Sequence, residues 1–237
     1  MKIEIWSDVV CPWCYIGKRR FETALARFEH RDQVEVVWRS FELDPHAPRH
    51  SEGAQDEMLA KKYGVSLAQA RAMIERVTRL AAQEGLEYHL DQAQRGNTFD
   101  AHRLIHLAAK QGLQGEMKER LLRAYFTEGR PISDTETLVS LGAEVGLPAG
   151  EVRAVLTSDA FADAVRADEQ RAAAFGIRGV PFFVIDEQFG VSGAQEADVL
   201  LTALQQAWAK SHPLTLVGAT PAETAVCDGE NCATEPA

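Results

Sequence analysis

The stretch Lys2-Ile3-Glu4-Ile5-Trp6-Ser7-Asp8-Val9-Val10-Cys11-Pro12-Trp13-Cys14 decides the fold of this chain. Apolar and polar residues alternate over residues 2–7, which predicts a short strand. Residues 12–30 then carry apolar side chains at helical spacing, and Pro12 suits the first turn of a helix, where its missing N–H costs nothing. The pair Cys11 and Cys14 therefore lies where a strand passes into a helix.

Outward from this stretch, the pattern predicts one α/β unit that is interrupted by helices. Residues 33–39 are β-branched and aromatic, which favours a second strand. Strand patterns return at residues 180–186 and 189–191, ahead of a helix over residues 195–210. Between the two groups of strands, residues 55–175 have helical spacing throughout and indicate six or seven helices.

These boundaries divide the chain into three predicted parts. Residues 1–42 and 176–212 form a small α/β domain with the order β-α-β … β-β-α, and residues 43–175 form an all-helical insertion domain. Residues 213–237 form a C-terminal tail, which we expect to be flexible and which holds a C-x4-C motif. Within the insertion, helix starts are expected at Ser66 with Gln69, at Ser133 with Glu136, and at Ser158.

Composition and charge exclude several classes of protein. Of the 237 residues, 46% are apolar and 25% are charged, as in ordinary globular proteins. The 35 acidic and 25 basic residues give a net charge of −10, which argues against nucleic acid and anionic membranes as partners. No run approaches the ~18 apolar residues of a membrane span. The first residues do not read as a secretory signal, so the expected location is cytoplasmic.

The C-x2-C spacing at a strand-to-helix junction points to thiol chemistry. In a reducing compartment such pairs are usually catalytic or metal-binding, and half of a zinc site is the alternative. The N-terminus of a helix carries partial positive charge and free N–H groups, which stabilise a thiolate. We therefore expect the pKa of Cys11 to lie below the ordinary thiol value of ~8.5. The more buried Cys14 is expected to stay a thiol until it resolves a mixed disulfide.

A proline stands where the third strand begins, in Gly179-Val180-Pro181-Phe182-Phe183. Proline removes a donor from a β-ladder, and a cis peptide bond between Val180 and Pro181 would explain its place. Such a loop would face the cysteines and present the Val180 backbone to a substrate strand. A trans proline at an edge strand is the alternative. Phe182 and Phe183 alternate along the strand, so only one of them is expected to face the site.

Together these motifs resemble the DsbA-like thioredoxin-fold proteins over about residues 1–210. The branch they resemble most is the cytoplasmic FrnE type of dithiol-disulfide isomerase or oxidoreductase, which is similar to the 2-hydroxychromene-2-carboxylate isomerases. The resemblance implies a thioredoxin fold and a cis Pro181. It also implies dithiol-disulfide exchange in which Cys11 attacks and Cys14 resolves. Other stretches that carry it are Phe41-Glu42-Leu43-Asp44-Pro45, Asn97-Thr98-Phe99-Asp100-Ala101-His102-Arg103 and Val191-Ser192-Gly193-Ala194-Gln195.

The expected partners are disulfide-containing or unfolded proteins, with a thiol reductant or oxidant for recycling. Val180, Pro181, Pro12 and Trp13 are expected to position the substrate. No resident cofactor is expected, and glutathione is considered as a redox partner. The alternative is a glutathione-linked isomerase or transferase of small aromatic substrates. The isomerase and kappa-class glutathione transferase relatives carry serine at the position of Cys11, a departure that counts against this alternative.

Two further motifs are left open by the sequence. Ser192 and Gln195 are expected to form a capping box at a helix N-terminus, which suits a glutathione carboxylate or serves as a cap alone. Three alternatives stay open for the tail pair Cys227 and Cys232. The pair acts as a redox relay or regulator, or it binds a metal, since zinc ligands use the C-x4-C spacing, or it has no specific role. A metal-binding or chaperone protein that uses the cysteine pairs is the non-enzymatic alternative. His102 and His106 are expected to be structural, although they stand four apart on a helix.

Overall fold

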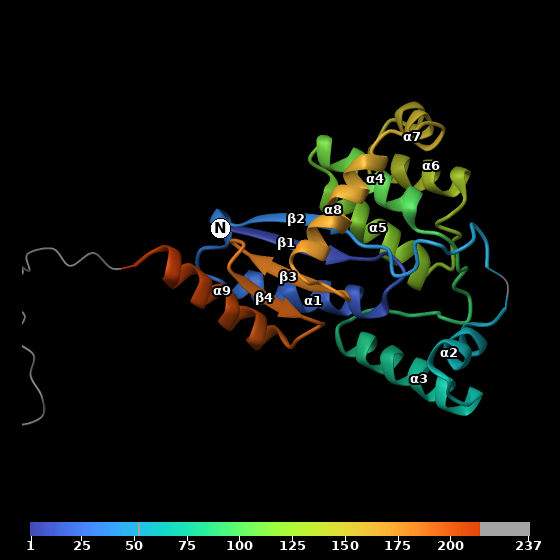
Figure 1. Cartoon of the computed structure of the whole chain (residues 1–237), viewed down its shortest axis with the longest axis horizontal. Coiled ribbons are helices and arrows are strands. Elements are labelled where there is room, and N and C mark those ends of the chain that lie inside the picture. The colour runs from blue at the N-terminus through green and yellow to red at the C-terminus, as the bar shows by residue number, and fades with distance from the viewer. Residues whose placement is uncertain (52, 214–237) are drawn as a thin grey trace, which may run out of the picture.

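The protein is built around a mixed four-stranded sheet in a computed structural model that describes residues 1–51 and 53–213 (Figure 1). The strand order is β2-β1-β3-β4, in which β1 and β2 are parallel and the other neighbours are antiparallel. The predicted thioredoxin order β-α-β … β-β-α is confirmed. The strands are β1 (Lys2–Ser7), β2 (Glu35–Ser40), β3 (Phe182–Ile185) and β4 (Phe189–Ser192).

Nine α-helices and one short 3-10 helix occur in the described residues, and seven of the α-helices lie between β2 and β3, as the spacing predicts. None of the helices in the described ranges is both long and apolar enough to cross a membrane. The helices are α1 (Pro12–Arg27), η1 (Arg31–Gln33), α2 (Gln55–Tyr63), α3 (Leu67–Gln83), α4 (Phe99–Lys110), α5 (Gln114–Phe126), α6 (Thr135–Glu144), α7 (Ala149–Leu156), α8 (Ala162–Ala174) and α9 (Ala197–Ser211).

Alternation along the strands gives the sheet two apolar faces. Ile5 of β1 pairs with Phe183 of β3, and both belong to the main core under α1 and α9. There the rings of Phe21 and Phe183 lie 5.6 Å apart between centroids. Trp6, the next residue of β1, points to the opposite face and packs with Ala172 of α8. The central strands β1 and β3 are therefore covered on both faces of the sheet.

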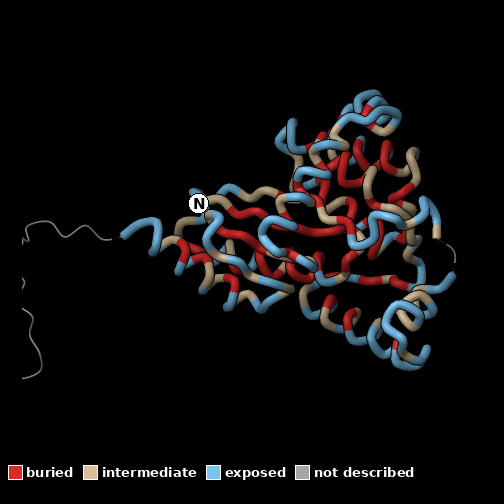
Figure 2. The backbone as a smooth tube through the Cα atoms, in the orientation of Figure 1, coloured by how far each residue is buried: buried red, intermediate tan, exposed pale blue. Residues whose placement is uncertain are grey.

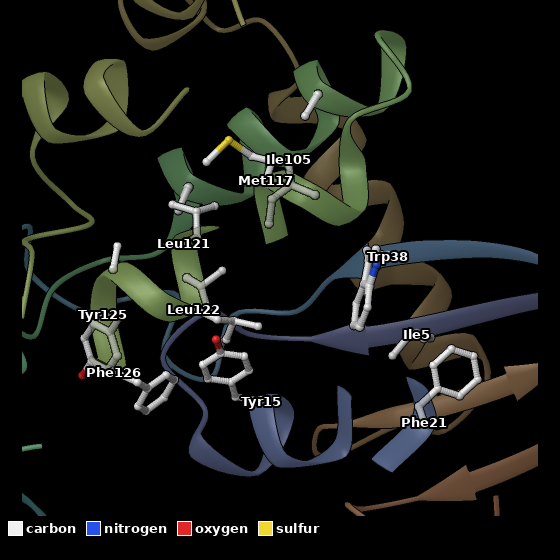
Figure 3. Close-up of a cluster of buried hydrophobic side chains, with 14 of the residues drawn as sticks. Ile5, Tyr15, Phe21, Trp38, Ile105, Met117, Leu121, Leu122, Tyr125 and Phe126 are labelled. Carbon is white, nitrogen blue, oxygen red and sulfur yellow. The ribbon is translucent and has the colours of Figure 1, made fainter. Parts of the chain in front are cut away.

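The helices of the insertion pack directly against one end of the sheet. Figure 3 shows Leu122 of α5 beside Tyr15 of α1, with Trp38 of β2 nearby, and all three belong to one hydrophobic cluster. Buried residues follow both the strands and the central insertion helices (Figure 2). The hairpin of α2 and α3 projects from this body (Figure 1), and α2 has no buried residue. Because the core is shared, the insertion can place side chains close to the cysteines. The exact domain boundaries stay a prediction.

Helix starts within the insertion were partly predictable. The capping box at Ser66 is present, because its side chain accepts from the Gln69 N–H and the Gln69 side chain accepts from the Ser66 N–H. The predicted box at Ser133 is wrong: Asp134 is the N-cap of α6 and accepts from the Thr137 N–H. The cap at Ser158 is wrong as well, since α8 begins at Ala162. At the start of α6 it is the Asp134 carboxylate that accepts a hydrogen bond from a free N–H group of the first turn, at 2.8 Å.

An ion-pair network fixes α8 to the outer face of the sheet. Glu4 of β1 accepts from Arg39 of β2 and from Arg171 of α8. Asp168, which is buried on α8, accepts from Arg39 at 2.9 Å and lies 3.1 Å from Nε2 of His106. Burial alone would raise the pKa of Asp168, but hydrogen bonds with His106 and the Ser40 N–H, together with the charge of Arg39, hold it below its ordinary value. The network thus joins the insertion to the strand that leads into the cysteine motif.

Candidate functional site

The cysteine motif lies at the N-terminus of α1, where the sequence places it. Cys11 is the N-cap residue and Pro12 is the first helical residue. The Cys14 N–H donates to the Cys11 carbonyl at 3.0 Å, which closes the first turn. Both cysteines are free thiols, and the exposed fraction is 4% for Cys11 and 1% for Cys14, whereas Trp13 is 40% exposed. Of the residues between the two buried thiols, Trp13 is therefore the exposed one.

The loop before β3 faces this motif across the sheet edge. The Val180–Pro181 peptide bond is cis, as predicted. The Cys11 thiol donates to the carbonyl of Val180 at 3.6 Å. Pro181 packs against α1 at Gly17, where a Cβ atom would lie 2.9 Å from Cγ of Pro181. Gly17 is thus required for the close approach of loop and helix, although the sequence pattern gave no reason to single it out.

The ionisation of the two thiols differs from the sequence-based expectation. The hydrogen bond that Cys11 shares with Cys14, together with burial, raises the pKa of Cys11 well above its ordinary value. Burial also opposes ionisation of Cys14, but the Cys11 thiol, the charge of Lys118 and the Ser7 hydroxyl lower the pKa of Cys14. Because the two sulfurs share a hydrogen bond, loss of the first proton is a property of the pair. The helix N-terminus still favours negative charge at Cys11, but burial beside a second sulfur outweighs it.

A group of buried polar side chains lies behind the thiols. Asp8 accepts from the N–H groups of Val9 and Leu43, and its Oδ1 lies 3.2 Å from Nε2 of His102. Burial would raise the pKa of Asp8, but hydrogen bonds from His102 and Leu43 lower it. Burial lowers the pKa of His102 despite its contact with Asp8. A structural role for this histidine stays a prediction.

Lys118 of α5 enters the same group from the insertion. Its Nζ donates to the carbonyl of Ser7 at 3.1 Å, and it is 1% exposed. Burial lowers the pKa of Lys118 to about 8, although the negative charges of Cys14 and Asp8 oppose this shift. The Ser7 hydroxyl is buried and has no ordinary hydrogen-bond partner within the described part of the chain. Both groups thus remain available to a negative charge on Cys14.

Aromatic residues of the insertion brace the motif from another side. The Tyr88 hydroxyl donates to the Pro12 carbonyl at 2.7 Å, and the ring of Tyr88 stacks on that of Phe126 with centroids 4.6 Å apart. Tyr15, one residue after the motif, donates to Glu119 of α5 at 2.6 Å. These contacts hold the first turn of α1 against the insertion.

Other predicted residues have different outcomes. Ser192 ends β4, and α9 begins only at Ala197 after Glu196, so the predicted capping box is wrong. Instead the Gln195 side chain donates to the Ser192 carbonyl at 2.8 Å, which leaves an anion site at these residues as a prediction. Phe183 is buried in the core, while Phe182 packs with Phe41 and Val180 on the other face, which confirms the alternation.

The tail pair, Cys227 and Cys232, lies outside the described residues. Among residues 1–51 and 53–213, no cluster of three or more His, Cys, Asp or Glu side chains is arranged to hold a metal ion. Sequence reasoning missed the roles of Ser7, Asp8, Tyr88 and Lys118. Only Ser7 and Asp8 carried a signal, because polar residues at the end of a buried strand stand next to the motif.

Comparison with known proteins agrees with this geometry. Residues 2–205 match the DSBA-like thioredoxin domain. The chain belongs to this family. It is similar to a probable DsbA oxidoreductase of Streptomyces coelicolor, with 48% identity, a TM-score of 0.86 and full coverage of both chains. It also shares 28% identity with the uncharacterized protein YwbO of Bacillus subtilis, over 85% of this chain and 94% of that protein.

More distant members of the fold have varied activities. The cytosolic disulfide reductase DsbM of Pseudomonas aeruginosa, solved with GSH, superposes with a TM-score of 0.62 at 18% identity, over 88% of this chain and 99% of that one. A 2-hydroxychromene-2-carboxylate isomerase superposes with a TM-score of 0.66 at 13% identity, over 89% of this chain and 98% of that one. At these identities the likeness concerns the fold alone. In this chain Cys11, Cys14 and the cis Pro181 lie within the range that matches the DSBA-like thioredoxin domain.

Proposed function

We propose that this protein is a cytoplasmic dithiol-disulfide oxidoreductase that reduces or isomerises disulfides of proteins. The observation that carries the proposal is the approach of the Cys11 thiol to the Val180 carbonyl on the cis-proline loop. An extended substrate that pairs with the Val180 backbone would bring its disulfide to Cys11. The exposed ring of Trp13 beside it supplies apolar surface for an unfolded chain.

The reaction follows from the two sulfurs. Cys11 gives up its proton and attacks one sulfur of a substrate disulfide RS–SR′, which forms a Cys11–S–R mixed disulfide and releases R′S⁻. That thiolate takes up a proton and becomes R′SH. Cys14 then loses its proton and attacks the Cys11 sulfur, which releases RS⁻ and, after protonation, RSH. Two electrons pass from the enzyme dithiol to the substrate, and both protons leave with the two product thiols.

Recycling decides the net direction. A thiol reductant such as glutathione returns the enzyme disulfide to the dithiol and gives net reduction, whereas an oxidant reverses the cycle. Release of the mixed disulfide by a second thiol of the same substrate gives isomerisation instead. This activity is of the FrnE type, and holding unfolded chains at the site would add chaperone action. The acidic net charge of −10 fits protein substrates rather than nucleic acid or membrane partners.

Differential alkylation in glutathione buffers of graded redox ratio tests the proposal. In the wild-type protein we expect Cys11 and Cys14 to pass together from dithiol to intramolecular disulfide, with one midpoint. Cys14→Ser should accumulate a mixed disulfide between Cys11 and a substrate peptide, while the matched variant Cys11→Ser should form none. Absence of a Cys11–Cys14 disulfide at every ratio would overturn the proposal. Turnover of a small aromatic substrate that survives in Cys14→Ser would favour the glutathione-linked isomerase.

The tail pair is proposed as a relay for the same cycle. Cys227 and Cys232 would exchange electrons with Cys11 and Cys14 by thiol-disulfide exchange. In this case the double variant Cys227→Ser with Cys232→Ser should shift the redox midpoint or slow multiple turnover, while single-turnover attack by Cys11 stays unchanged. Unchanged turnover and midpoint would remove the relay. Stoichiometric zinc that is lost in the same variant would assign the pair to metal binding instead.

A further inference from the structure

A buried arginine of α1, which the reaction described above leaves unused, joins three segments beside the cis-proline loop. Arg20 is 7% exposed, and each nitrogen of its guanidinium group faces a different segment. Nη1 donates to the carbonyl of Ala194 at 2.8 Å, Nε donates to Oε1 of Glu84 at 2.6 Å, and Nη2 lies 2.8 Å from Oε1 of Glu196. Because a guanidinium group is planar and rigid, these contacts fix the three segments relative to one another.

The contact with Ala194 leads directly to the cis-proline loop. The N–H of Gly193, at the end of β4, donates to the carbonyl of Pro181 at 2.8 Å. Ala194 also lies against α1, since a Cβ atom added at Gly17 would stand 3.5 Å from both its Cα and its Cβ. Gly17 and Arg20 are three residues apart and therefore share one face of α1. The turn at Gly193 and Ala194 thus connects Arg20 to Pro181.

The contact with Glu84 connects the same arginine to the insertion. Glu84 is the C-cap residue of α3, and a negative charge is unfavourable at the C-terminus of a helix. The positive charge of Arg20 compensates for this position. Val77 and Ala81 of α3 belong to the main core, and α3 packs against α1. The end of α3 and the turn at Ala194 are therefore held together by one buried cation of α1.

We propose that Arg20 is a positioning residue for the thiol-disulfide exchange, because it holds the cis-proline loop in place relative to Cys11. The inference rests on the proposed function and adds a residue outside the cysteine motif. Without the guanidinium group, the carbonyl of Ala194 loses its donor and the turn that holds Pro181 is no longer tied to α3. The Val180 carbonyl then shifts relative to Cys11, and substrates that pair with the Val180 backbone react more slowly.

This role predicts a selective loss rather than a general one. A substrate strand must contact the Val180 backbone and the Cys11 sulfur together, so its reaction depends on the position of the loop. A small reagent contacts the sulfur alone, so its reaction does not depend on that position. The quantity that the proposal changes is therefore the ratio of two rates at the same sulfur.

Two reagents, each applied to the same cysteine, test the proposal. In a Cys14→Ser background, peptide mass spectrometry follows the reaction of Cys11 at one pH with an extended peptide disulfide or with iodoacetamide. In Arg20→Met we expect the rate with the peptide disulfide to fall about tenfold or more, while the rate with iodoacetamide changes by less than about twofold. Arg27→Met is the matched control, because Arg27 lies on the same helix and pairs at the surface with Asp198 of α9 at 2.7 Å. The control should leave both rates unchanged.

Amide hydrogen exchange gives a second readout, with both cysteines intact. The N–H of Gly193, which donates to Pro181, should exchange about tenfold faster in Arg20→Met than in the wild-type protein and at the wild-type rate in Arg27→Met. If Arg20→Met does not fold, Arg20→Lys takes its place in both measurements. Its ammonium group keeps the charge beside Glu84 but cannot reach three acceptors in the geometry of a planar fork, so the same changes are expected.

The outcomes separate this inference from the proposed function. An unchanged ratio of the two rates in a folded Arg20 variant, or an unchanged exchange rate at Gly193, would overturn the inference while wild-type Cys11 and Cys14 still form a reversible disulfide. An equal fall of both rates has the same meaning, because it is a general effect on the fold. If the wild-type pair forms no disulfide, the proposed function itself has failed.

Discussion

The contact between Gly17 and Pro181 yields a prediction in which two known effects oppose each other. Replacement of a helical glycine by alanine stabilises a helix by about 0.5–1 kcal/mol, because glycine loses more backbone entropy on folding. Gly17 lies inside α1, so Gly17→Ala gains this contribution. The added Cβ, however, would lie 2.9 Å from Cγ of Pro181 and 3.5 Å from the Cα of Ala194. A methyl group forced into packed space costs about 1–3 kcal/mol.

The balance predicts a small net loss of stability and a larger loss of function. Subtraction of the helix gain leaves a net destabilisation of up to about 2 kcal/mol, or a fall in Tm of up to about 4–8 °C for a chain of this size. The proline loop is the part that yields, since α1 is fixed by its own backbone hydrogen bonds. Movement of Pro181 carries Val180 away from Cys11 and breaks the 3.6 Å contact. We expect the rate of mixed-disulfide formation at Cys11 to fall at least tenfold, because small misplacements at a reacting centre are costly.

Gly115→Ala serves as the matched control, because Gly115 lies within α5 and an added Cβ meets no atom within 4 Å. Denaturant unfolding and stopped-flow reaction of Cys11 with a peptide disulfide measure both effects. Gly115→Ala should be neutral or slightly stabilising, with the wild-type rate at Cys11. If Gly17→Ala is stabilised as much as the control and reacts at the wild-type rate, the packing of Pro181 on α1 does not set the geometry of the site.

Three further predictions concern the surroundings of the site. Tyr88→Phe removes the donor to the Pro12 carbonyl but keeps the ring, so the free energy of unfolding should fall by about 0.5–1.5 kcal/mol. Urea titration measures this change, and an unchanged free energy would mean that the hydrogen bond does not stabilise the fold. Asp168→Asn should lower the free energy of unfolding by less than the ~3–5 kcal/mol lost when a fully buried ion pair is broken, because Arg39 keeps Glu4 as a partner. A larger loss in the same urea titration would contradict this prediction. Burial raises the pKa of Glu42 to about 7, so the folded protein binds the Glu42 proton more tightly than the unfolded chain does. The protonated carboxyl therefore stabilises the fold at low pH, and this stabilisation should be lost as the pH rises from about 4.5 through 7. Glu42→Gln should flatten that part of the stability profile, and a profile with the wild-type slope would refute the assignment.

Local rules explain which parts of the fold were predictable. Alternation over residues 2–7 and helical spacing after Pro12 are short-range patterns, and β1 and α1 follow them closely. The cis peptide at Pro181 was predictable because a proline inside a strand pattern has few compatible backbone states. The capping boxes were less certain, since Asp134 replaced Ser133 and the turn at Gly193, with φ +81°, delayed the start of α9 beyond Gln195. Such choices depend on turn geometry that neighbouring residues do not fix.

The sequence by itself determined the strand-helix junction, the cysteine pair at it and the proline that faces it, because each depends on residues close together in the chain. The burial and the charged neighbours of the two sulfurs, in contrast, depend on the tertiary structure. Lys118 is separated from Cys14 by more than a hundred residues, and it reaches the site because α5 of the insertion packs on β1, β2 and α1 in one core. A thiol pKa depends on burial and on every charge nearby in space, and neither is a property of the motif.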